Sequence, residues 1–169
     1  MKVRTWAPLL AVALATIPAA PAAIAVDAVE APSPFAQLHG WWSGEGRLGF
    51  RDGKREPVRC RATYRRGATD NDLDQSIRCA TPAGKVEVIG QVSVIDGKLK
   101  GTWRETVHEL SGDMTGEVTE RGFRVVVASE GLQARMEIVT VGAQQVVEIQ
   151  FDTSVLVGLT LVLKKGEAS

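Results

Sequence analysis

Apolar and polar residues alternate along most of the sequence from residue 40 onward. The clearest case is segment 58–65, which places Val58, Cys60, Ala62 and Tyr64 on one face. The same period of two recurs in segments 42–50, 86–95, 99–103, 123–127, 132–139, 147–151 and 155–163. Successive side chains of a strand point to opposite faces, so this pattern predicts half-buried β-strands. No segment after residue 40 has a helical period, and we expect an all-β domain of about nine or ten antiparallel strands.

Short turn signals separate these segments. They are Asp52-Gly53, Asp96-Gly97, Ser111-Gly112, Arg121-Gly122 and Glu130-Gly131. Such dipeptides are typical of hairpins, and a meander of hairpins that closes on itself removes the exposed edges that a sandwich would keep. Glycines within the segments mark the bends that a tightly coiled barrel needs: Gly44, Gly46, Gly90, Gly101 and Gly116. The pattern therefore predicts an up-and-down barrel over residues 40–165, followed by a polar tail at 166–169.

The two cysteines test one register of this barrel. If segments 58–66 and 73–80 pair as a hairpin, Cys60 lies opposite Cys79 and Tyr64 lies opposite Gln75. A directly opposed pair brings the Cα atoms close enough for a disulfide. We expect one bridge, which also fits a small exported domain; two buried free thiols are the alternative.

The N-terminus has the features of an export signal. Lys2 and Arg4 precede an apolar run, and Ala23-Ile24-Ala25 ends a stretch rich in small residues. We expect a signal peptide at 1–25 and cleavage before Val26, followed by a Pro/Ala-rich leader at 26–39 with one short helical turn. An uncleaved anchor is the alternative, but prolines interrupt the end of the run. The mature protein is then expected to be periplasmic or secreted, with no transmembrane segment. A membrane barrel is disfavoured, because arginines on several strands would face lipid.

Three short motifs carry a resemblance to known barrels. Gly40-Trp41-Trp42, at the start of the first strand, resembles the opening of lipocalin-type (calycin) barrels. Gly97 to Trp103 and Gly112 to Val118 are similar to strands of avidin-like barrels. The resemblance implies that Trp42 plugs the closed end of the barrel. Lys164 and Lys165 stand near the last strand, where that family has an arginine packed on the tryptophan. The chain also resembles small periplasmic proteins of unassigned function from alphaproteobacteria.

Composition and motifs disfavour most catalytic chemistries. Lys+Arg 20 against Asp+Glu 20 lacks the basic excess of a nucleic-acid binder, so we expect no nucleic-acid partner. The two histidines, His39 and His108, lack the spacing of metal ligands, so no metal site is expected. Ser111, His108 and Asp113 could form a nucleophile only on paper, because no nucleophile elbow accompanies them.

Other catalytic and cofactor patterns are equally weak. Glu105 and Glu109 have nothing to hold them at a fixed separation in a cleft, as a glycosidase requires. No glycine-rich loop leads from a strand into a helix, so we expect no cofactor. The sequence thus points to a protein that is not an enzyme and has no catalytic residues.

A basic run is the most distinctive surface feature. Residues 47–66 hold eight basic and two acidic residues, whereas residues 105–152 hold nine acidic and three basic ones. The candidate patch for anionic envelope polymers or lipid headgroups is Arg47, Arg51, Arg55, Arg59, Arg61, Arg65 and Arg66. Solvated strand faces neutralised by neighbouring acids, such as Arg65 by Asp74, are the alternative.

The barrel interior is the other candidate site. Its expected ligand-lining residues are Tyr64, Trp103, Phe123 and Met136, with Trp42 closing the base. Many small and aliphatic inward residues leave either a filled core or an apolar cavity. We expect a binding protein for a small apolar or amphipathic ligand. A protein-binding module such as a protease inhibitor, and a binder of anionic polymers through the arginine patch, are the alternatives.

Overall fold

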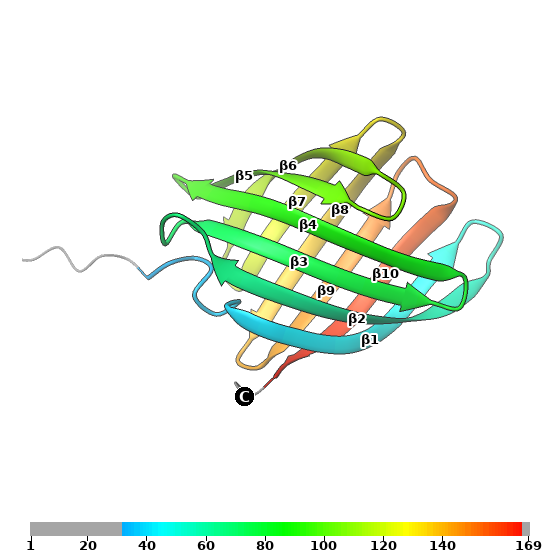
Figure 1. Cartoon of the computed structure of the whole chain (residues 1–169), viewed down its shortest axis with the longest axis horizontal. Helices are drawn as coiled ribbons and strands as arrows, with labels where there is room; N and C mark the ends of the chain where they lie inside the picture. The colour runs from blue at the N-terminus through cyan, green and yellow to red at the C-terminus, as the bar shows by residue number, and fades with distance from the viewer. Residues whose placement is uncertain (1–31, 167–169) are drawn as a thin grey trace, which may run out of the picture. The chain divides into compact units, whose positions relative to one another are not determined.

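The computed structural model describes residues 32–166, which form ten antiparallel strands without a helix (Figure 1). The strands are β1 (Gly40–Phe50), β2 (Arg55–Arg66), β3 (Asp72–Thr81), β4 (Gly84–Ile95), β5 (Lys98–Glu105), β6 (Leu110–Thr119), β7 (Gly122–Ser129), β8 (Leu132–Val141), β9 (Gln144–Phe151) and β10 (Leu156–Lys165). Each strand pairs with its neighbours in sequence, and β10 returns to pair with β1. The predicted all-β, up-and-down barrel is confirmed.

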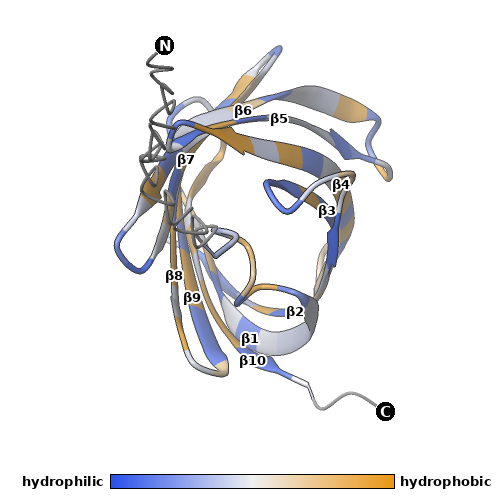
Figure 2. Ribbon diagram, turned by 90° about the vertical axis from the view of Figure 1, so that its left-hand side faces the viewer, coloured by the Kyte–Doolittle hydropathy of each residue, from blue (hydrophilic) through white to orange (hydrophobic). Residues whose placement is uncertain are grey.

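Closure of the barrel joins the two ends of the domain. Gly44 on β1 lies opposite both Leu163 on β10 and Cys60 on β2, so no strand edge is left free. Figure 2 looks along the barrel from the end at which residues 32–39 lie, and the strands form a complete ring. Hydrophobic and hydrophilic bands alternate along the strands, as the period of two requires.

The register predicted for the cysteine hairpin is confirmed. β2 and β3 pair Cys60 with Cys79, Tyr64 with Gln75 and Arg65 with Asp74. Cys60 and Cys79 form the disulfide across a Cα–Cα distance of 4.1 Å. The bridge ties two neighbouring strands on the inner face of the barrel.

Four of the five expected turn signals lie at hairpin connections, and one does not. Asp96 and Gly97 both have positive φ, at 51° and 73°, in the two-residue turn between β4 and β5. Ser111-Gly112 was predicted as a turn but lies inside β6, so that prediction is wrong. The preceding connection covers residues 106–109, where Glu109 takes the positive φ of 58° without a glycine.

The glycines within strands allow a close approach of neighbouring backbones. A Cβ atom on Gly44 would lie 1.9 Å from the carbonyl oxygen of Val162, and one on Gly101 would lie 2.2 Å from that of Gln91. Gly46 and Gly116 meet a neighbouring carbonyl in the same way. These positions accept no larger residue unless the backbone shifts, which explains their glycines.

One end of the barrel is closed by the chain that precedes β1. Phe35 and Leu38 are buried there, and the Phe35 ring stacks on Phe123 at 5.3 Å. The Trp42 indole donates to the Leu38 carbonyl at 2.7 Å. Lys165 Nζ lies 5.4 Å from the Trp42 ring and donates to the carbonyl of Gln37. We call this the closed end; the opposite end, formed by connections 51–54, 82–83, 106–109, 130–131 and 152–155, is the open end.

The predicted signal peptide at 1–25, residues 26–31 of the leader and residues 167–169 of the polar tail lie outside the described residues. Within 32–166 there is no helix that is long and apolar enough to cross a membrane.

Candidate functional site

The inner wall of the barrel changes character from the closed end to the open end. Near the closed end the inward side chains are buried, as at Leu73, Leu99, Phe123 and Leu163. Together with the Phe35 segment they form one packed apolar core. This half of the barrel is filled.

Toward the open end, inward side chains of several strands keep part of their surface exposed. These half-buried apolar residues are Leu48, Phe50, Val88, Val127, Met136, Ile149, Phe151 and Leu159. Val88, Val127, Met136, Ile149 and Leu159 pack against the core and still keep part of their surface exposed. The open half therefore has inward apolar side chains that are not fully buried.

The five residues predicted to line a ligand site all lie on the inner face, but at different depths. Trp42 and Phe123 belong to the closed end, where the Phe35 segment covers them. Trp103 lies on β5 and is 7% exposed, whereas Met136 on β8 is half-buried. Only Met136 thus belongs to the exposed part of the wall.

Tyr64 is part of a small polar network inside the barrel. Its hydroxyl donates to Gln145 Oε1 at 3.2 Å, and the Gln145 amide donates to Thr140 Oγ1 at 3.4 Å. All three residues are buried. Burial raises the pKa of Tyr64 to about 12, so the phenol stays protonated and keeps its donor.

Two carboxylates at the open rim also point inward, and neither was predicted as an inward residue. Glu105 is buried and accepts hydrogen bonds from the backbone N–H groups of Glu87, Val107 and His108. Its Oε2 also lies 3.0 Å from His108 Nδ1. Burial alone would raise the pKa of Glu105, but these donors together lower it to about 2.

Glu56 is the second inward carboxylate. Lys54 donates to its Oε1 at 2.6 Å and lowers the pKa of Glu56. The two carboxylates therefore hold rim turns. The alternation along each strand could have identified them as inward-facing, because Glu56 lies two residues from Val58 and Glu105 lies two residues from Trp103.

The residues weighed for catalysis do not meet in one place. Ser111 and Asp113 point outward from β6, and among the described residues no hydrogen bond joins either of them to His108. His39 lies in the segment that closes the barrel, half-buried, at the opposite end from His108. Within 32–166, no group of three or more His, Cys, Asp or Glu is arranged to hold a metal ion.

The seven arginines of the predicted basic patch are all exposed on β1, β2 and their adjoining turns. Three of them have partners. Arg59 pairs with Glu45, Arg66 pairs with Asp70, and Arg51 donates to the carbonyls of Ser154 and Asp152. Arg65 lies opposite Asp74 without an ion pair, because Asp74 accepts from Gln91.

The outer face of β1–β4 gathers further basic residues beside Arg59. Arg61 lies directly opposite Arg78 of β3, and both are exposed. Together with Arg59 and Lys85 they line a groove whose acidic residues are Glu45 and Glu87. Arg78 pairs with Glu87 at 2.8 Å and Arg59 pairs with Glu45, so the charges of Arg61 and Lys85 leave the groove with a net positive charge.

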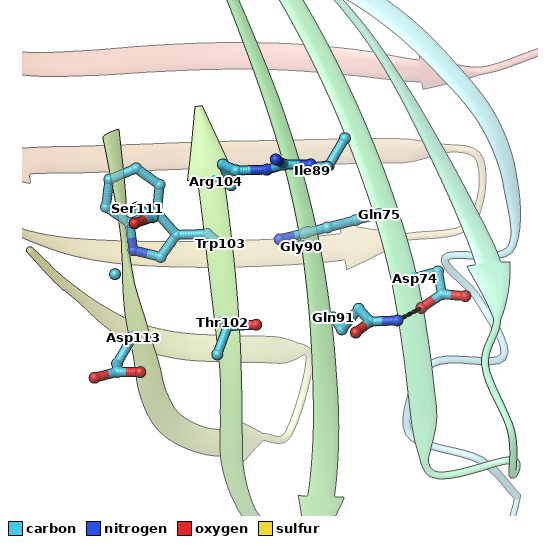
Figure 3. A pocket seen from close by; sticks show the side chains of 11 residues that line it. Asp74, Gln75, Ile89, Gly90, Gln91, Thr102, Trp103, Arg104, Ser111 and Asp113 are labelled. Carbon is cyan, nitrogen blue, oxygen red and sulfur yellow. Dashed lines mark hydrogen bonds between the residues drawn. The ribbon is translucent and has the colours of Figure 1, made fainter. Parts of the chain in front are cut away.

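A second depression, of about 610 Å³, lies on the outer face of β3–β6 (Figure 3). Asp74, Gln91, Thr102 and Asp113 follow one row across these strands. Arg104 and Ser111 belong to the next outward row, and the Asp74–Gln91 hydrogen bond is drawn as a dashed line. Between the two rows lie the backbones of Gly90 and Gly112, whose lack of a side chain accounts for the hollow.

Comparison with known proteins shows the fold and no closer relationship. No protein-family pattern and no curated protein matches the sequence. The solved structure of Rv2717c from M. tuberculosis is similar, with a TM-score of 0.68 and 14% identity over 81% of this chain and 99% of that one. The S-type phycobiliprotein lyase CPES from Guillardia theta has a TM-score of 0.61 and 11% identity over 80% of this chain and 92% of that one. The shared ten-stranded barrel agrees with the calycin-like resemblance of the sequence. The resemblance to alphaproteobacterial proteins stays a prediction.

Proposed function

We propose that the protein binds a small apolar or amphipathic molecule inside the open half of the barrel. One observation carries this proposal: inward apolar side chains such as Val127, Ile149 and Leu159 stay partly exposed in the open half. A filled barrel would bury them, as it buries their counterparts near the closed end. Concave apolar sites with few polar groups are the usual form of small-molecule sites.

A pair of substitutions on one strand tests this function. Val127 points inward and is half-buried, whereas its neighbour Val126 is 36% exposed and points outward. We expect the protein to bind N-phenyl-1-naphthylamine, an uncharged apolar fluorescent probe. Val127→Phe should weaken this binding at least tenfold, because the larger ring occupies the site, and Val126→Phe should leave it unchanged. Absence of probe binding by the unaltered protein, or equal binding by both variants, would refute the proposal.

We infer that the role is binding rather than catalysis. The carboxylates that face the interior, Glu56 and Glu105, are engaged in rim turns. The lyase among the similar structures shares 11% of its residues with this chain, which carries the fold alone. The disulfide supports an oxidising compartment, and with the predicted signal peptide we propose a periplasmic or secreted protein.

The net positive charge of the groove that holds Arg61 and Arg78 favours a second candidate function, binding of an acidic envelope polymer on the outer face. Arg61→Gln combined with Arg78→Gln should abolish retention on a heparin column, used as an acidic polysaccharide probe. The matched control is Arg124→Gln with Arg135→Gln, because these exposed arginines lie on β7 and β8. Retention should fall steeply with salt. Equal retention of both double variants would exclude the site.

A further inference from the structure

Three polar side chains share one row of the apolar inner wall. The row crosses β3, β4, β5 and β6 through the paired residues Gln75, Gly90, Trp103 and Gly112. A Cβ atom on Gly112 would lie 2.9 Å from the Cβ of Ser129, which continues the row onto β7. Polar side chains therefore alternate with glycines along it. Figure 3 shows Gln75, Gly90 and Trp103 on three successive strands.

Two of these groups are buried without a hydrogen-bond partner. Within residues 32–166, neither Trp103 Nε1 nor the Ser129 hydroxyl has one. The third is weakly engaged, since the Gln75 amide donates to the Met114 sulfur, a weak acceptor, at 3.7 Å. Buried polar groups in proteins almost always have partners, so unpartnered ones on the same wall call for an explanation.

The chemistry of the row indicates what would satisfy it. An indole N–H is a donor only, and a serine hydroxyl and a glutamine amide also donate. The group that completes the row is therefore an acceptor oxygen. The Gln75 amide and the Met114 methyl lie over Gly90, 2.8 and 3.1 Å from its Cβ position, and both belong to flexible side chains that can move to admit the ligand oxygen.

We propose that Gln75, Trp103 and Ser129 form a polar anchor that binds the carbonyl or carboxylate oxygen of an otherwise apolar ligand. The inference rests on the proposed function and narrows it to a ligand class: a hydrocarbon body against the aliphatic wall, with an oxygen acceptor held at the β5–β7 side. A purely hydrocarbon ligand leaves the anchor unpartnered, and a ligand whose polar group only donates leaves the Trp103 indole N–H unpartnered.

Competition against N-phenyl-1-naphthylamine tests the anchor. Decanoic acid and decan-2-one both carry an acceptor oxygen, whereas protonated decylamine has the same chain length and no acceptor. We expect the acid and the ketone to displace the probe at lower concentrations than the amine. The neutral ketone shows that the preference does not arise from the charge of the acid.

Conservative variants assign the effect to the anchor. Trp103→Phe and Ser129→Ala should each weaken binding of the acid and the ketone, measured relative to binding of the probe by the same variant, by roughly threefold to tenfold, the range of one lost hydrogen bond. Trp41→Phe and Ser111→Ala are matched controls, because these exposed residues lie at the closed end and on the outer face. In ¹⁵N–¹H spectra, the indole resonance missing in Trp103→Phe should shift when decanoic acid is added to the unaltered protein.

The outcomes separate the two proposals. If the unaltered protein does not bind the probe, the proposed function fails and the anchor fails with it. If the probe binds but the three competitors are equivalent, or the two variants lose nothing, the anchor alone is overturned. An unchanged Trp103 resonance at saturating decanoic acid would also overturn it.

Discussion

Glu105 is a single side chain that holds one rim of the barrel together. Its two oxygens accept from three backbone N–H groups and lie beside His108, in a connection that has neither glycine nor proline. In turns such as 96–97 and 130–131 a glycine takes a positive φ, whereas here Glu109 takes it and the Glu105 carboxylate binds the backbone of the turn. The carboxylate acts only while ionised, since a protonated carboxyl loses part of its acceptor capacity.

This residue gives the protein a defined acid sensitivity. The pKa of Glu105 falls from its usual 4.5 to about 2 on folding, so its stabilisation is complete above pH 4.5 and is lost as the pH falls toward 2. Glu105→Gln should lower the urea midpoint at pH 7. The gap from the unaltered protein should then narrow between pH 4.5 and 2. Glu109→Gln, in the same connection, should follow the unaltered protein. A gap that is constant with pH would contradict the assignment.

Lys165 lies where the family that the sequence resembles has an arginine against the tryptophan. The arginine expected against the tryptophan is replaced by a lysine whose ammonium lies over the Trp42 ring and bonds the Gln37 carbonyl. The first is a cation–π contact with the ring face, and the second is a charge-assisted hydrogen bond to the carbonyl. The sequence identified the position, between Lys164 and Lys165, but the parity of β10 decides which lysine faces Trp42.

At the level of strands, the glycines of this barrel differ in the space around their Cβ positions. Gly101 sits where a neighbouring carbonyl would lie 2.2 Å from an added Cβ, whereas Gly84 has open space around its Cβ position. Gly101→Ala should therefore destabilise the protein by about 2 kcal/mol, the typical cost of overpacking. Gly84→Ala should change stability by less than about 0.5 kcal/mol, as surface substitutions usually do. Urea denaturation of both variants measures the difference; equal midpoints would show that β4 and β5 separate at little cost.

The strands and the pairing of β2 with β3 were predicted well from the sequence, whereas one turn was not. Alternation located the strands, and the cysteine pair set the register of β2 and β3, because a slip of one residue would turn Cys60 outward. The turn predicted at Ser111-Gly112 is wrong because a glycine can mark a close approach of two backbones as well as a turn. A Cβ on Gly112 would lie 1.9 Å from the carbonyl of Ala128. The actual turn, at residues 106–109, is held by the Glu105 side chain and contains no glycine or proline that would mark it in the sequence.

For the molecule as a whole, the two ends of the barrel differ. The parity of the strands predicted which residues face inward, Trp42, Tyr64, Trp103, Phe123 and Met136 among them. The place of Trp42 at the closed end was also predicted, but the burial of Phe123 was not, because it depends on Phe35. Phe35 and Leu38 belong to a Pro/Ala-rich segment with no periodic pattern, yet they bury their side chains in the barrel end. The rim carboxylates and the Trp103–Ser129 row depend in the same way on contacts between distant strands.

Phe35 should therefore control both the stability of the barrel and the closure of one end. It is 1% exposed and stacks on Phe123, but it belongs to no strand. Phe35→Ala should lower the free energy of unfolding by about 3 kcal/mol or more, as for other buried phenylalanines, while the far-ultraviolet spectrum keeps its β character. Dissociation of N-phenyl-1-naphthylamine, measured by stopped flow, should become faster, because the packed core beneath the site loses the ring that stacks on Phe123. Gln37→Ala is the matched control, since its side chain is exposed and its carbonyl still accepts from Lys165. An unchanged urea midpoint for Phe35→Ala would show that the strands alone close the barrel.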